Sequence, residues 1–496
     1  MQQAVLVIDV GSSSVRAVLF AGADMLDTAD EKISAGREID ADAYWQIISQ
    51  LVSSLTGRNC NVAVTGIGVT SLVSWTFIDA EGCPVGLTKT WMDANQDLLG
   101  AFHAAFDQDV FFNSTGRCAG AELGGLKLQR LRHDFPEAYT RVSSLLSFKD
   151  FVNFRLTGVA AMDRTTACYT MLYNIRTGAW DADIAAAINV DTAKLPPLKN
   201  GNEPVGPLKT DVAQSLGLSP GIPVVACGPD GSVGALGAGL SAQGEAVSVM
   251  GTTDVFFAVS EKALLDPKKR LVTNPFLIPG LWLLGGPLGM SGGALDWFAK
   301  TIDAGRHSMN ELDLAAAAVS PGCDGVMAIP SLTGERTPFW NALVRGTFTG
   351  ITPETTQSHL YRALMEANGY TTRYLLDILS EMGLTVRSLT AIGGGAKSEF
   401  WMQMKADITN CPVHVPAQTE ASSLGAAMLA AMQTAGKAAP GAMARAGKTR
   451  PGACAFAPSP NERYQLYYQR YLALQKAGAA LYEAWNGQRP ESGEKP

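Results

Sequence analysis

The stretch GPDGSVGALGAG, Gly228 to Gly239, lies near the middle of the chain and follows an apolar run from Ile222 to Cys227. The apolar run predicts a buried strand, and the small residues after it predict a helix with a narrow face. Such a face allows another backbone or a ligand to come very close. Asp230 stands at the turn between strand and helix, where two roles are open: a helix-capping residue, or a general base for a substrate hydroxyl.

Two strand–turn–strand units with hydroxyl-rich turns lie about half a chain apart. The first turn is Gly11-Ser12-Ser13-Ser14 and the second is Gly251-Thr252-Thr253, and apolar runs flank each of them. Backbone N–H groups and hydroxyls in such turns can bind phosphate, but Gly and Ser are also ordinary turn residues. The repeat suggests two similar domains that face each other across a cleft, each with one phosphate-binding turn.

Two further features are suited to a nucleotide and its metal ion. Asp9 ends the first strand, and Mg²⁺ prefers one or two carboxylates together with phosphate oxygens. Gly393-Gly394-Gly395 follows the strand expected at Leu389 to Ile392 and leads into a helix that starts near Ser398. A glycine-rich turn at a helix N-terminus is suited to an anion or a nucleotide, although one such turn is a weak signal.

Composition limits the class of protein. The chain of 496 residues is long enough for two large domains, and its 47% hydrophobic residues are enough for a large core. The 39 Lys and Arg residues against 46 Asp and Glu give a net charge of −7, without a basic block. Nucleic acid is therefore not an expected partner.

Location also follows from composition. The apolar runs are too short to cross a membrane, and the N-terminus lacks the basic region and cleavage site of a signal peptide. The eight Cys residues include no CxxC pair, so neither a disulfide framework nor a zinc site is predicted. We expect no membrane partner and a cytoplasmic location.

Taken in order and spacing, the motifs make the chain similar to the FGGY family of carbohydrate kinases over roughly residues 4–435. A second signature of that family begins at Gly346-Thr347-Phe348-Thr349-Gly350-Ile351 and continues at His359-Leu360 and Ala363-Leu364-Met365-Glu366. The other motifs that carry the resemblance are Asp9-Val10-Gly11-Ser12-Ser13-Ser14-Val15-Arg16, Gly228 to Gly239, Met250-Gly251-Thr252-Thr253, Ser291-Gly292-Gly293-Ala294, Gly334-Glu335-Arg336-Thr337-Pro338, and Gly393-Gly394-Gly395-Ala396-Lys397-Ser398 with Trp401, Gln403, Ala406 and Asp407.

The resemblance implies an α/β protein with the actin-like ATPase fold, in which two ribonuclease H-like domains enclose a cleft. It implies an N-terminal sugar-binding kinase domain at residues 1–243 and a C-terminal ATP-binding kinase domain at residues 244–435. We expect residues 436–496 to form a linker and a final helix that docks on the body. The implied reaction is phosphorylation of a sugar hydroxyl, with ATP and Mg²⁺ as cofactors.

The resemblance also implies roles for particular residues. Asp230 matches the family's proton-abstracting Asp and is the expected general base. Asp9, with Asp230, is the expected metal site. The residues expected to bind the nucleotide and its phosphates are Gly11, Ser12, Ser13, Arg16, Gly251, Thr252, Gly293, Gly394, Gly395 and Ser398.

This chain departs from the family pattern at the residues expected to form the sugar pocket. Glycerol kinases have an Arg-Glu pair and xylulose kinases a Met-His pair where this chain has Val73-Ser74, so glycerol is not expected as substrate. Trp91 and Asp93 match the family's Trp-x-Asp loop, although Asn95 stands where Arg is usual. We expect sugar contacts from Ser74, Trp75, Trp91, Asp93 and Asp230. Alternatively, Trp75 belongs to the core and Asp93 caps a helix.

The expected substrate is a small sugar or polyol, with a ketopentose as in xylulose kinases placed first. A tetritol, a hexulose or an aldonate such as gluconate remains an alternative. A member of a different class, a nucleotide-binding sensor without catalysis, is the rival hypothesis. The complete motif around Asp230 and the lack of an added DNA-binding module argue against the sensor. A homodimer is the expected assembly.

Overall fold

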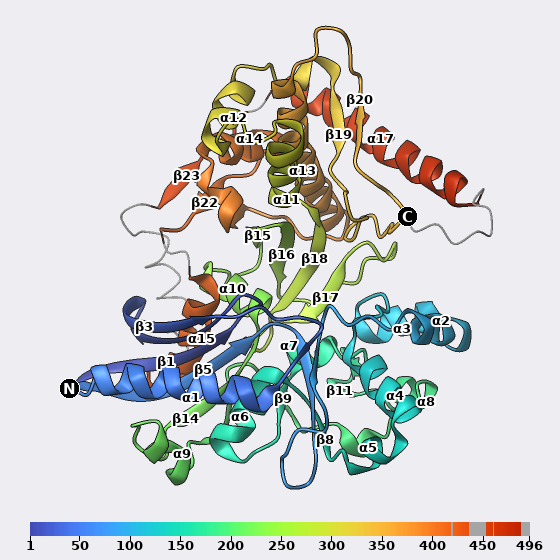
Figure 1. Cartoon of the computed structure of the whole chain (residues 1–496). Coiled ribbons are helices and arrows are strands. Elements are labelled where there is room, and N and C mark those ends of the chain that lie inside the picture. The colour runs from blue at the N-terminus through green and yellow to red at the C-terminus, as the bar shows by residue number, and fades with distance from the viewer. Residues whose placement is uncertain (418–419, 436–452, 460, 488–496) are drawn as a thin grey trace.

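Two β-sheets, each covered by helices, lie one above the other in the computed structural model (Figure 1). The structure describes residues 1–417, 420–435, 453–459 and 461–487. In Figure 1 the sheet built from the N-terminal strands (blue) occupies the lower half, and the later strands form the sheet of the upper half. The molecule therefore has two lobes with the middle of the chain between them.

The N-terminal sheet has three antiparallel strands followed by two strands parallel to the first. Its strand order is β13-β14-β5-β1-β2-β3. β1 pairs antiparallel with β2 and parallel with β5, which in turn pairs parallel with β14. The strands span β1 (Gln2–Val10), β2 (Ser14–Ala21), β3 (Asp24–Lys32), β5 (Val62–Ser71), β13 (Pro204–Pro207) and β14 (Pro223–Pro229).

The C-terminal sheet repeats this topology. Its order is β17-β18-β16-β15-β21-β22-β23, in which β15, β16 and β18 are antiparallel and β21 and β22 run parallel to β15. The repeat confirms the predicted α/β fold of two ribonuclease H-like domains. The strands span β15 (Glu245–Met250), β16 (Thr253–Ser260), β17 (Val272–Pro275), β18 (Trp282–Met290), β21 (Ser388–Ile392), β22 (Val413–Val415) and β23 (Cys454–Phe456).

Helices and short strands surround the two sheets. The first half contains α1 (Ala41–Arg58), α2 (Gln96–Ala105), α3 (Gln108–Thr115), α4 (Gly124–Asp134), α5 (Pro136–Arg141), α6 (Phe148–Thr157), α7 (Arg164–Cys168), α8 (Ala182–Ala187), α9 (Thr210–Ser215) and α10 (Asp230–Gly237). The second half contains α11 (Gly292–Trp297), α12 (Met309–Ala317), α13 (Gln357–Glu381), α14 (Glu399–Thr409), α15 (Ala421–Ala435) and α17 (Glu462–Gly487). A small side sheet has the order β4 (Glu38–Ile39), β7 (Thr88–Thr90), β6 (Ser74–Ile78) and β8 (Ser144–Ser147), and the other short strands are β9 (Met162–Asp163), β10 (Tyr173–Asn174), β11 (Ala179–Trp180), β12 (Leu198–Lys199), β19 (Met327–Ile329) and β20 (Thr347–Thr349).

The helix that follows β14 packs its narrow face against a backbone from the other half of the chain. A Cβ atom on Gly237 of α10 would lie 1.8 Å from the Ala421 carbonyl oxygen, and one on Gly425 of α15 would lie 1.9 Å from the Val233 carbonyl oxygen. α15 also packs on β1, β5 and β14 (Figure 1). The second half of the chain therefore returns to cover the N-terminal sheet.

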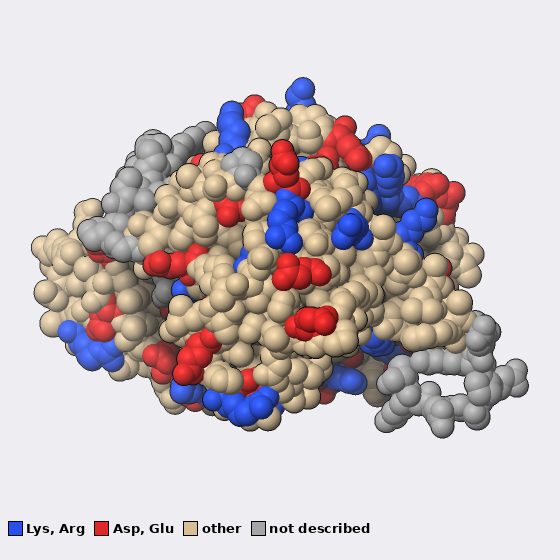
Figure 2. Space-filling view, turned by 90° about the horizontal axis from the view of Figure 1, so that it is seen from above, with Lys and Arg blue, Asp and Glu red and all other residues tan. Residues whose placement is uncertain are grey.

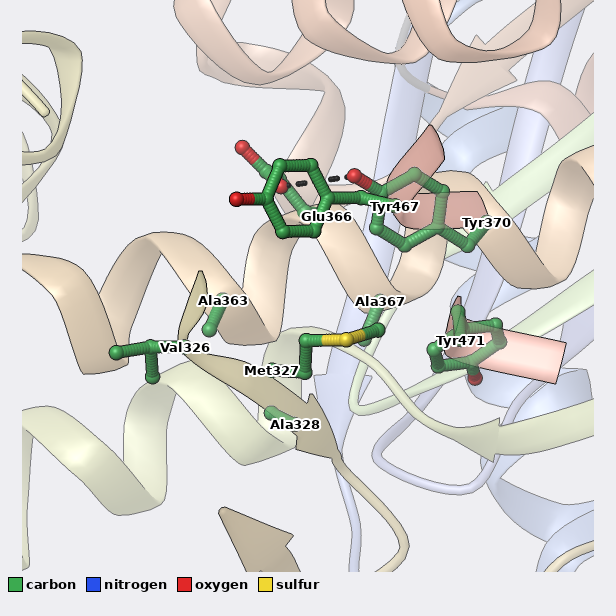
Figure 3. Close-up of a pocket in the computed structure, with 9 residues that line it drawn as sticks. All are labelled: Val326, Met327, Ala328, Ala363, Glu366, Ala367, Tyr370, Tyr467 and Tyr471. Atoms are coloured by element: carbon green, nitrogen blue, oxygen red, sulfur yellow. Dashed lines mark hydrogen bonds between the residues drawn. The ribbon is translucent and has the colours of Figure 1, made fainter. Parts of the chain in front are cut away.

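The final helix packs on the C-terminal lobe. Tyr467 and Tyr471 of α17 lie against α13 and β19, and the Tyr370 hydroxyl donates to Glu366 at 3.0 Å (Figure 3). The cavity between these side chains holds about 10 Å³, room for no more than one water molecule. The helix is thus a packing element of this lobe, whereas residues 436–452 of the expected linker lie outside the described residues.

Surface charge and helix composition are the features relevant to nucleic-acid and membrane partners. Basic and acidic side chains alternate over the face seen from above (Figure 2). Among the described residues, none of the helices combines the length and the apolar character that crossing a bilayer requires.

Candidate active site

Three strand ends of the N-terminal sheet meet at one edge and carry the central carboxylates. Asp9 of β1 is in register with Thr70 of β5, and Thr70 is in register with Gly228 of β14. The Thr70 hydroxyl donates to the Gly228 carbonyl oxygen at 2.9 Å. Asp230 follows two residues later as the first residue of α10. The edge thus brings Asp9 and Asp230 into the same neighbourhood, as the sequence predicted for the metal and base positions.

A bulge in β14 directs the chain into this turn. The register shifts between Val225 and Gly228, and Cys227 adopts a φ of +51°. The Lys149 ammonium donates to the Ala226 carbonyl oxygen at 3.1 Å and lies 2.7 Å from Asp163, and all three groups are buried. Bulges next to active sites re-aim the residues that follow them. The buried lysine therefore supports the turn that carries Asp230.

Asp230 has the properties of a base that works near neutral pH. Burial raises the pKa of Asp230 to about 7, the Gly231 N–H that donates to its Oδ1 at 2.7 Å opposes this rise, and the charge of Asp9 adds to it. A catalytic base is most effective when its pKa lies close to the working pH. The carboxylate is thus suited to accept a proton from a hydroxyl.

The start of α15 contacts both carboxylate positions from the opposite half of the chain. The Ser423 hydroxyl donates to Oδ2 of Asp9 at 2.8 Å, and the Ser422 hydroxyl donates to the Asp230 carbonyl oxygen at 3.3 Å. Burial raises the pKa of Asp9, while the Ser423 hydrogen bond lowers it. Arg16, predicted to bind nucleotide, forms an ion pair with Glu420 just before α15.

The carboxylates fit a metal ion that binds together with phosphate. Within residues the structure describes, no cluster of three or more His, Cys, Asp or Glu side chains is arranged to hold a metal ion by itself. Mg²⁺ does not need such a cluster, because it uses one or two carboxylates plus waters and substrate phosphates. Asp9 and Asp230 are a donor set of that kind.

A large pocket in the C-terminal lobe collects five of the ten residues predicted to bind the nucleotide. It holds about 860 Å³, enough for a nucleotide, and is lined by the β15–β16 turn, by α11, by one side of α12 and by the glycine turn after β21. Gly394 has open space where a side chain would be, so a ligand can approach its backbone closely. The predicted residues that line the pocket are Gly251, Thr252, Gly394, Gly395 and Ser398.

Gly293 lies beneath the second hairpin turn, outside the pocket lining. Its N–H donates to the Thr252 carbonyl oxygen at 3.0 Å, and the Gly292 N–H donates to the Gly251 carbonyl oxygen at 3.0 Å. A Cβ on Gly293 would lie 2.9 Å from the Thr252 oxygen. Gly293 therefore acts on the nucleotide pocket by holding the turn.

A buried polar network behind this turn was missed by the sequence reasoning. The Lys405 ammonium donates to the Ser248 hydroxyl at 2.7 Å and to the Asn368 amide oxygen at 3.0 Å, and it lies 3.4 Å from Asp254. Burial lowers the pKa of Lys405, and the Asp254 carboxylate raises it. Asn368 also donates to the Ser291 hydroxyl at 3.2 Å. The network ties β15, β16, α13 and α14 together directly behind the turn.

The first hairpin turn faces solvent at the same edge as Asp9. The Ser12 and Ser13 side chains are exposed, and their carbonyl oxygens accept from the Ala35 and Ile33 N–H groups at 2.9 and 3.0 Å. The Gly11 N–H closes the turn by donating to the Ser14 carbonyl oxygen at 2.9 Å. These contacts hold the turn, and its exposed hydroxyls are accessible to a phosphate.

The structure corrects the expectation for Trp75 and Ser74. Both are 0% exposed; the Trp75 ring packs where a Cβ on Gly124 would lie 2.7 Å away, and the Ser74 hydroxyl donates to the Leu72 carbonyl oxygen at 3.0 Å. Every residue of β6 is buried, because helices cover the outer face of this side sheet as well. Trp75 therefore has no face on which a sugar can stack.

Trp91 and Asp93 lie at the surface side of the same lobe. Trp91 is 44% exposed, and Asp93 lies 3.4 Å from the fully buried Lys127 ammonium. Asp93 and Lys127 line a pocket of about 460 Å³, and Asp230 is not among its lining residues. The structure thus brings Asp93 together with Lys127 and places Asp230 in different surroundings.

Tyr169, which interacts electrostatically with Asp230, and Arg117, which stacks on Tyr169, were also missed. Burial raises the pKa of the Tyr169 phenol, the Arg117 guanidinium lowers it, and the Asp230 carboxylate raises it further. The carbon at the centre of the Arg117 guanidinium lies 4.3 Å from the centroid of the Tyr169 ring. Single residues far apart in the chain give no local pattern, so the sequence held no signal for this cluster.

The chain matches the models of both domains of one kinase family. Residues 4–237 match the N-terminal domain and residues 246–434 the C-terminal domain of the FGGY family of carbohydrate kinases. Together the two matches span most of the chain, and they agree with the resemblance that the motifs carry.

Individual relatives give the same result. A xylulose kinase of Escherichia coli strain K12 is 30% identical over 413 residues, 81% of this chain and 84% of the relative. A glycerol kinase of Deinococcus radiodurans is 30% identical over 457 residues, 87% of this chain and 89% of the relative. The crystal structure of a xylulose kinase from Rhodospirillum rubrum has a TM-score of 0.90 at 27% identity, covering 97% of this chain and 100% of that one. The chain therefore belongs to the FGGY family of carbohydrate kinases and is an ATP-dependent sugar kinase.

Proposed function

We propose that the protein phosphorylates a hydroxyl of a ketopentose, with Asp230 as the general base and Mg²⁺ as the metal ion. The observation that carries the proposal is the Asp230 carboxylate, whose pKa burial raises to about 7 at the edge where Asp9 also lies. The xylulose kinases among the relatives support the choice of a ketopentose.

The chemistry consists of positioning and electrostatic stabilisation, because phosphoryl transfer asks little covalent work of a protein. Asp230 accepts the proton of the sugar hydroxyl as the hydroxyl oxygen attacks the γ-phosphoryl group. Ser12 and Thr252 bind phosphate oxygens from opposite lobes, because they stand on the turns of opposite sheets. Asp9 and Asp230 would hold Mg²⁺, which when bound offsets charge on the phosphates. Closure of the lobes keeps water from replacing the sugar.

The proposed cellular location follows from the reaction. A kinase that consumes ATP needs the nucleotide pool of the cytoplasm, and we place the protein there. The assembly we propose is a homodimer, to be measured by light scattering, with a monomeric mass contradicting it. Neither proposal bears on the chemistry of the site.

The test is ADP release with a panel of acceptors at saturating ATP and Mg²⁺. We expect pentuloses to give the highest kcat/KM and glycerol to be a very poor substrate, since Val73-Ser74 offers no ionisable ligand to a polyol. A panel in which glycerol is best would contradict the substrate assignment. ADP release that does not depend on any sugar would contradict the kinase reaction itself.

A further inference from the structure

A buried guanidinium beside Tyr169 lacks a carboxylate partner. Arg117 follows α3 and is 6% exposed, and among the described residues no Asp or Glu oxygen lies within 4.0 Å of its nitrogens. Its Nη2 donates to the Asn274 side-chain oxygen at 3.1 Å, and Asn274 is fully buried. A buried charge without a counter-charge is costly, and native proteins rarely retain one without a purpose.

Two buried N–H donors of this pair have no acceptor in the described chain. They are Nε of Arg117 and Nδ2 of Asn274. Each buried donor left without an acceptor costs about 1–3 kcal/mol, which is why such groups are normally matched. Because both unmatched groups are donors, an acceptor oxygen from outside the described chain would satisfy them.

The pair spans the two lobes. Asn274 belongs to β17 at the edge of the C-terminal sheet, whereas Arg117 belongs to the N-terminal lobe. Next to it, the Thr273 N–H donates to the Gly116 carbonyl oxygen at 2.8 Å, and a Cβ on Gly116 would lie 2.4 Å from the Thr273 oxygen. The two backbones are therefore fixed against each other, and the donors are held in place before any ligand binds.

The same elements connect the pair with the catalytic edge. α7 packs against both β14, which leads to Asp230, and β17, which carries Asn274. The Thr165 hydroxyl of α7 donates to the Pro275 carbonyl oxygen at 3.0 Å. Tyr169, directly after α7, stacks on Arg117 and lies within electrostatic reach of Asp230. A sugar whose reacting hydroxyl is at Asp230 can thus extend towards Arg117.

The chemistry of the donors selects one kind of oxygen. A ketone carbonyl or a carboxylate oxygen only accepts hydrogen bonds, whereas a hydroxyl also brings a hydrogen that needs an acceptor of its own. We propose that Arg117 and Asn274 bind an acceptor-only oxygen of the substrate, a ketose carbonyl or an aldonate carboxylate, at the end of the sugar away from Asp230. The proposal rests on the sugar kinase reaction above and selects against polyols.

The decisive variant is Asn274→Asp, because it supplies Arg117 with a carboxylate and removes the unmatched amide donor. If the pair only stabilises the fold, this change leaves sugar use intact. If the pair binds substrate, the new carboxylate repels the acceptor oxygen while the protein keeps its melting temperature. Arg117→Lys, which keeps the charge but removes Nε, is the second variant. Asn113→Asp, the same exchange at an exposed position of α3, is the control.

The measurement is kcat/KM for three phosphoryl acceptors. D-xylulose has a ketone carbonyl, D-xylonate has a carboxylate, and xylitol has only hydroxyls. We expect Asn274→Asp to lower kcat/KM for the preferred oxidised acceptor by about 10- to 100-fold. For xylitol and for ATP we expect changes below about threefold, as for Asn113→Asp with every substrate. A preference of the parent for D-xylulose assigns the carbonyl, and a preference for D-xylonate assigns the carboxylate. The proposal would be overturned if Asn274→Asp left the kcat/KM values for D-xylulose and D-xylonate unchanged relative to the value for xylitol.

Binding separates this inference from the proposed reaction. If the parent protein releases no ADP with any sugar, the proposed reaction fails, and the rise in melting temperature with D-xylulose or D-xylonate then tests the site. The inference holds if Asn274→Asp loses a rise that the parent shows. It fails if neither sugar shifts the parent, or if the variant shifts equally.

Discussion

The carboxylate of Asp230 is close to half-protonated at neutral pH, because burial raises its pKa to about 7. A base that is protonated cannot accept a proton from a hydroxyl, so the active form is the one present above this pKa. With Asp230 as the proposed base, turnover should depend on the surroundings of this one side chain at the end of β14.

We expect kcat/KM to fall as the pH drops below about 7, and to rise to a plateau above it. Asp230→Asn should lose about 10²–10⁴-fold in kcat, because it removes the base while keeping the shape of the side chain. The measurement is the pH dependence of ADP release by parent and variant.

Two comparisons make this prediction specific. The residual activity of Asp230→Asn should show no fall below pH 7, since the group that titrates is gone. Binding of ATP and sugar, followed by thermal shift, should remain close to that of the parent. A variant with kcat within a few-fold of the parent would remove Asp230 from its role.

Residues with a local chemical signature could be singled out from the sequence, and residues defined by tertiary contacts could not. Asp9, Gly251 and Gly394 stand in or beside turns whose composition is suited to a ligand. The expected sugar contact of Trp75 was wrong, because a strand near a ligand site and a strand in the core can have the same composition. Only the helices that cover the strand distinguish the two cases. Arg117 meets Asn274 across 157 positions of the chain, and no spacing rule reports such a pair.

Among the elements, α10 and α15 show why the central glycine stretch has its composition. Gly237 faces α15 at a distance that leaves no room for a side chain, whereas a Cβ on Gly234 would lie 3.2 Å from the Ser422 hydroxyl and one on Gly231 would have nothing within 4 Å. The glycines of this stretch are therefore present for different reasons, and Gly237 serves helix packing rather than a ligand.

We expect Gly237→Ala to lower the melting temperature, because the new Cβ would lie 1.8 Å from the Ala421 oxygen and must push the helices apart. Overpacking of this kind costs about 1–3 kcal/mol, and occasionally more. Differential scanning calorimetry of the purified protein gives the comparison.

Gly231→Ala is the matched control on the same helix. It adds the same methyl group into open space and should be neutral or stabilise by up to about 1 kcal/mol, because Ala favours the helix over Gly. Equal effects of the two variants would mean that the approach of α10 and α15 does not limit stability. Activity is not the measure here, because Gly231 adjoins Asp230, the proposed base.

At the scale of the whole molecule, the presence of two similar domains was predictable from the sequence. The packing of α15 on the N-terminal sheet was not. The two hydroxyl-rich turns indicated two similar domains, and the two sheets have corresponding strand orders. No pattern in the sequence indicates that α15 pairs with β1 and β5, since the apolar Ala and Leu residues of α15 suit either lobe. A boundary near residue 243 therefore divides the sheets but leaves α15 on the far side of it.

We expect residues 1–243, produced alone, to aggregate, because α15 buries apolar residues of β1, β14 and α10. Production together with residues 244–496 should recover a soluble complex, as the missing cover is then supplied in trans. Size-exclusion chromatography of the two preparations is the measurement. A monodisperse, folded fragment 1–243 would show that α15 is dispensable for the N-terminal sheet.

The late position of α15 also matters while the protein is being made. Roughly 200 residues separate the end of α10 from the end of α15, and a ribosome adding 5–20 residues per second needs about 10–40 s to synthesise them. For that interval the nascent N-terminal half has its strands but lacks the helix that covers them. The growing chain is thus a substrate for chaperones until its second half emerges, and the speed of translation sets how long that exposure lasts.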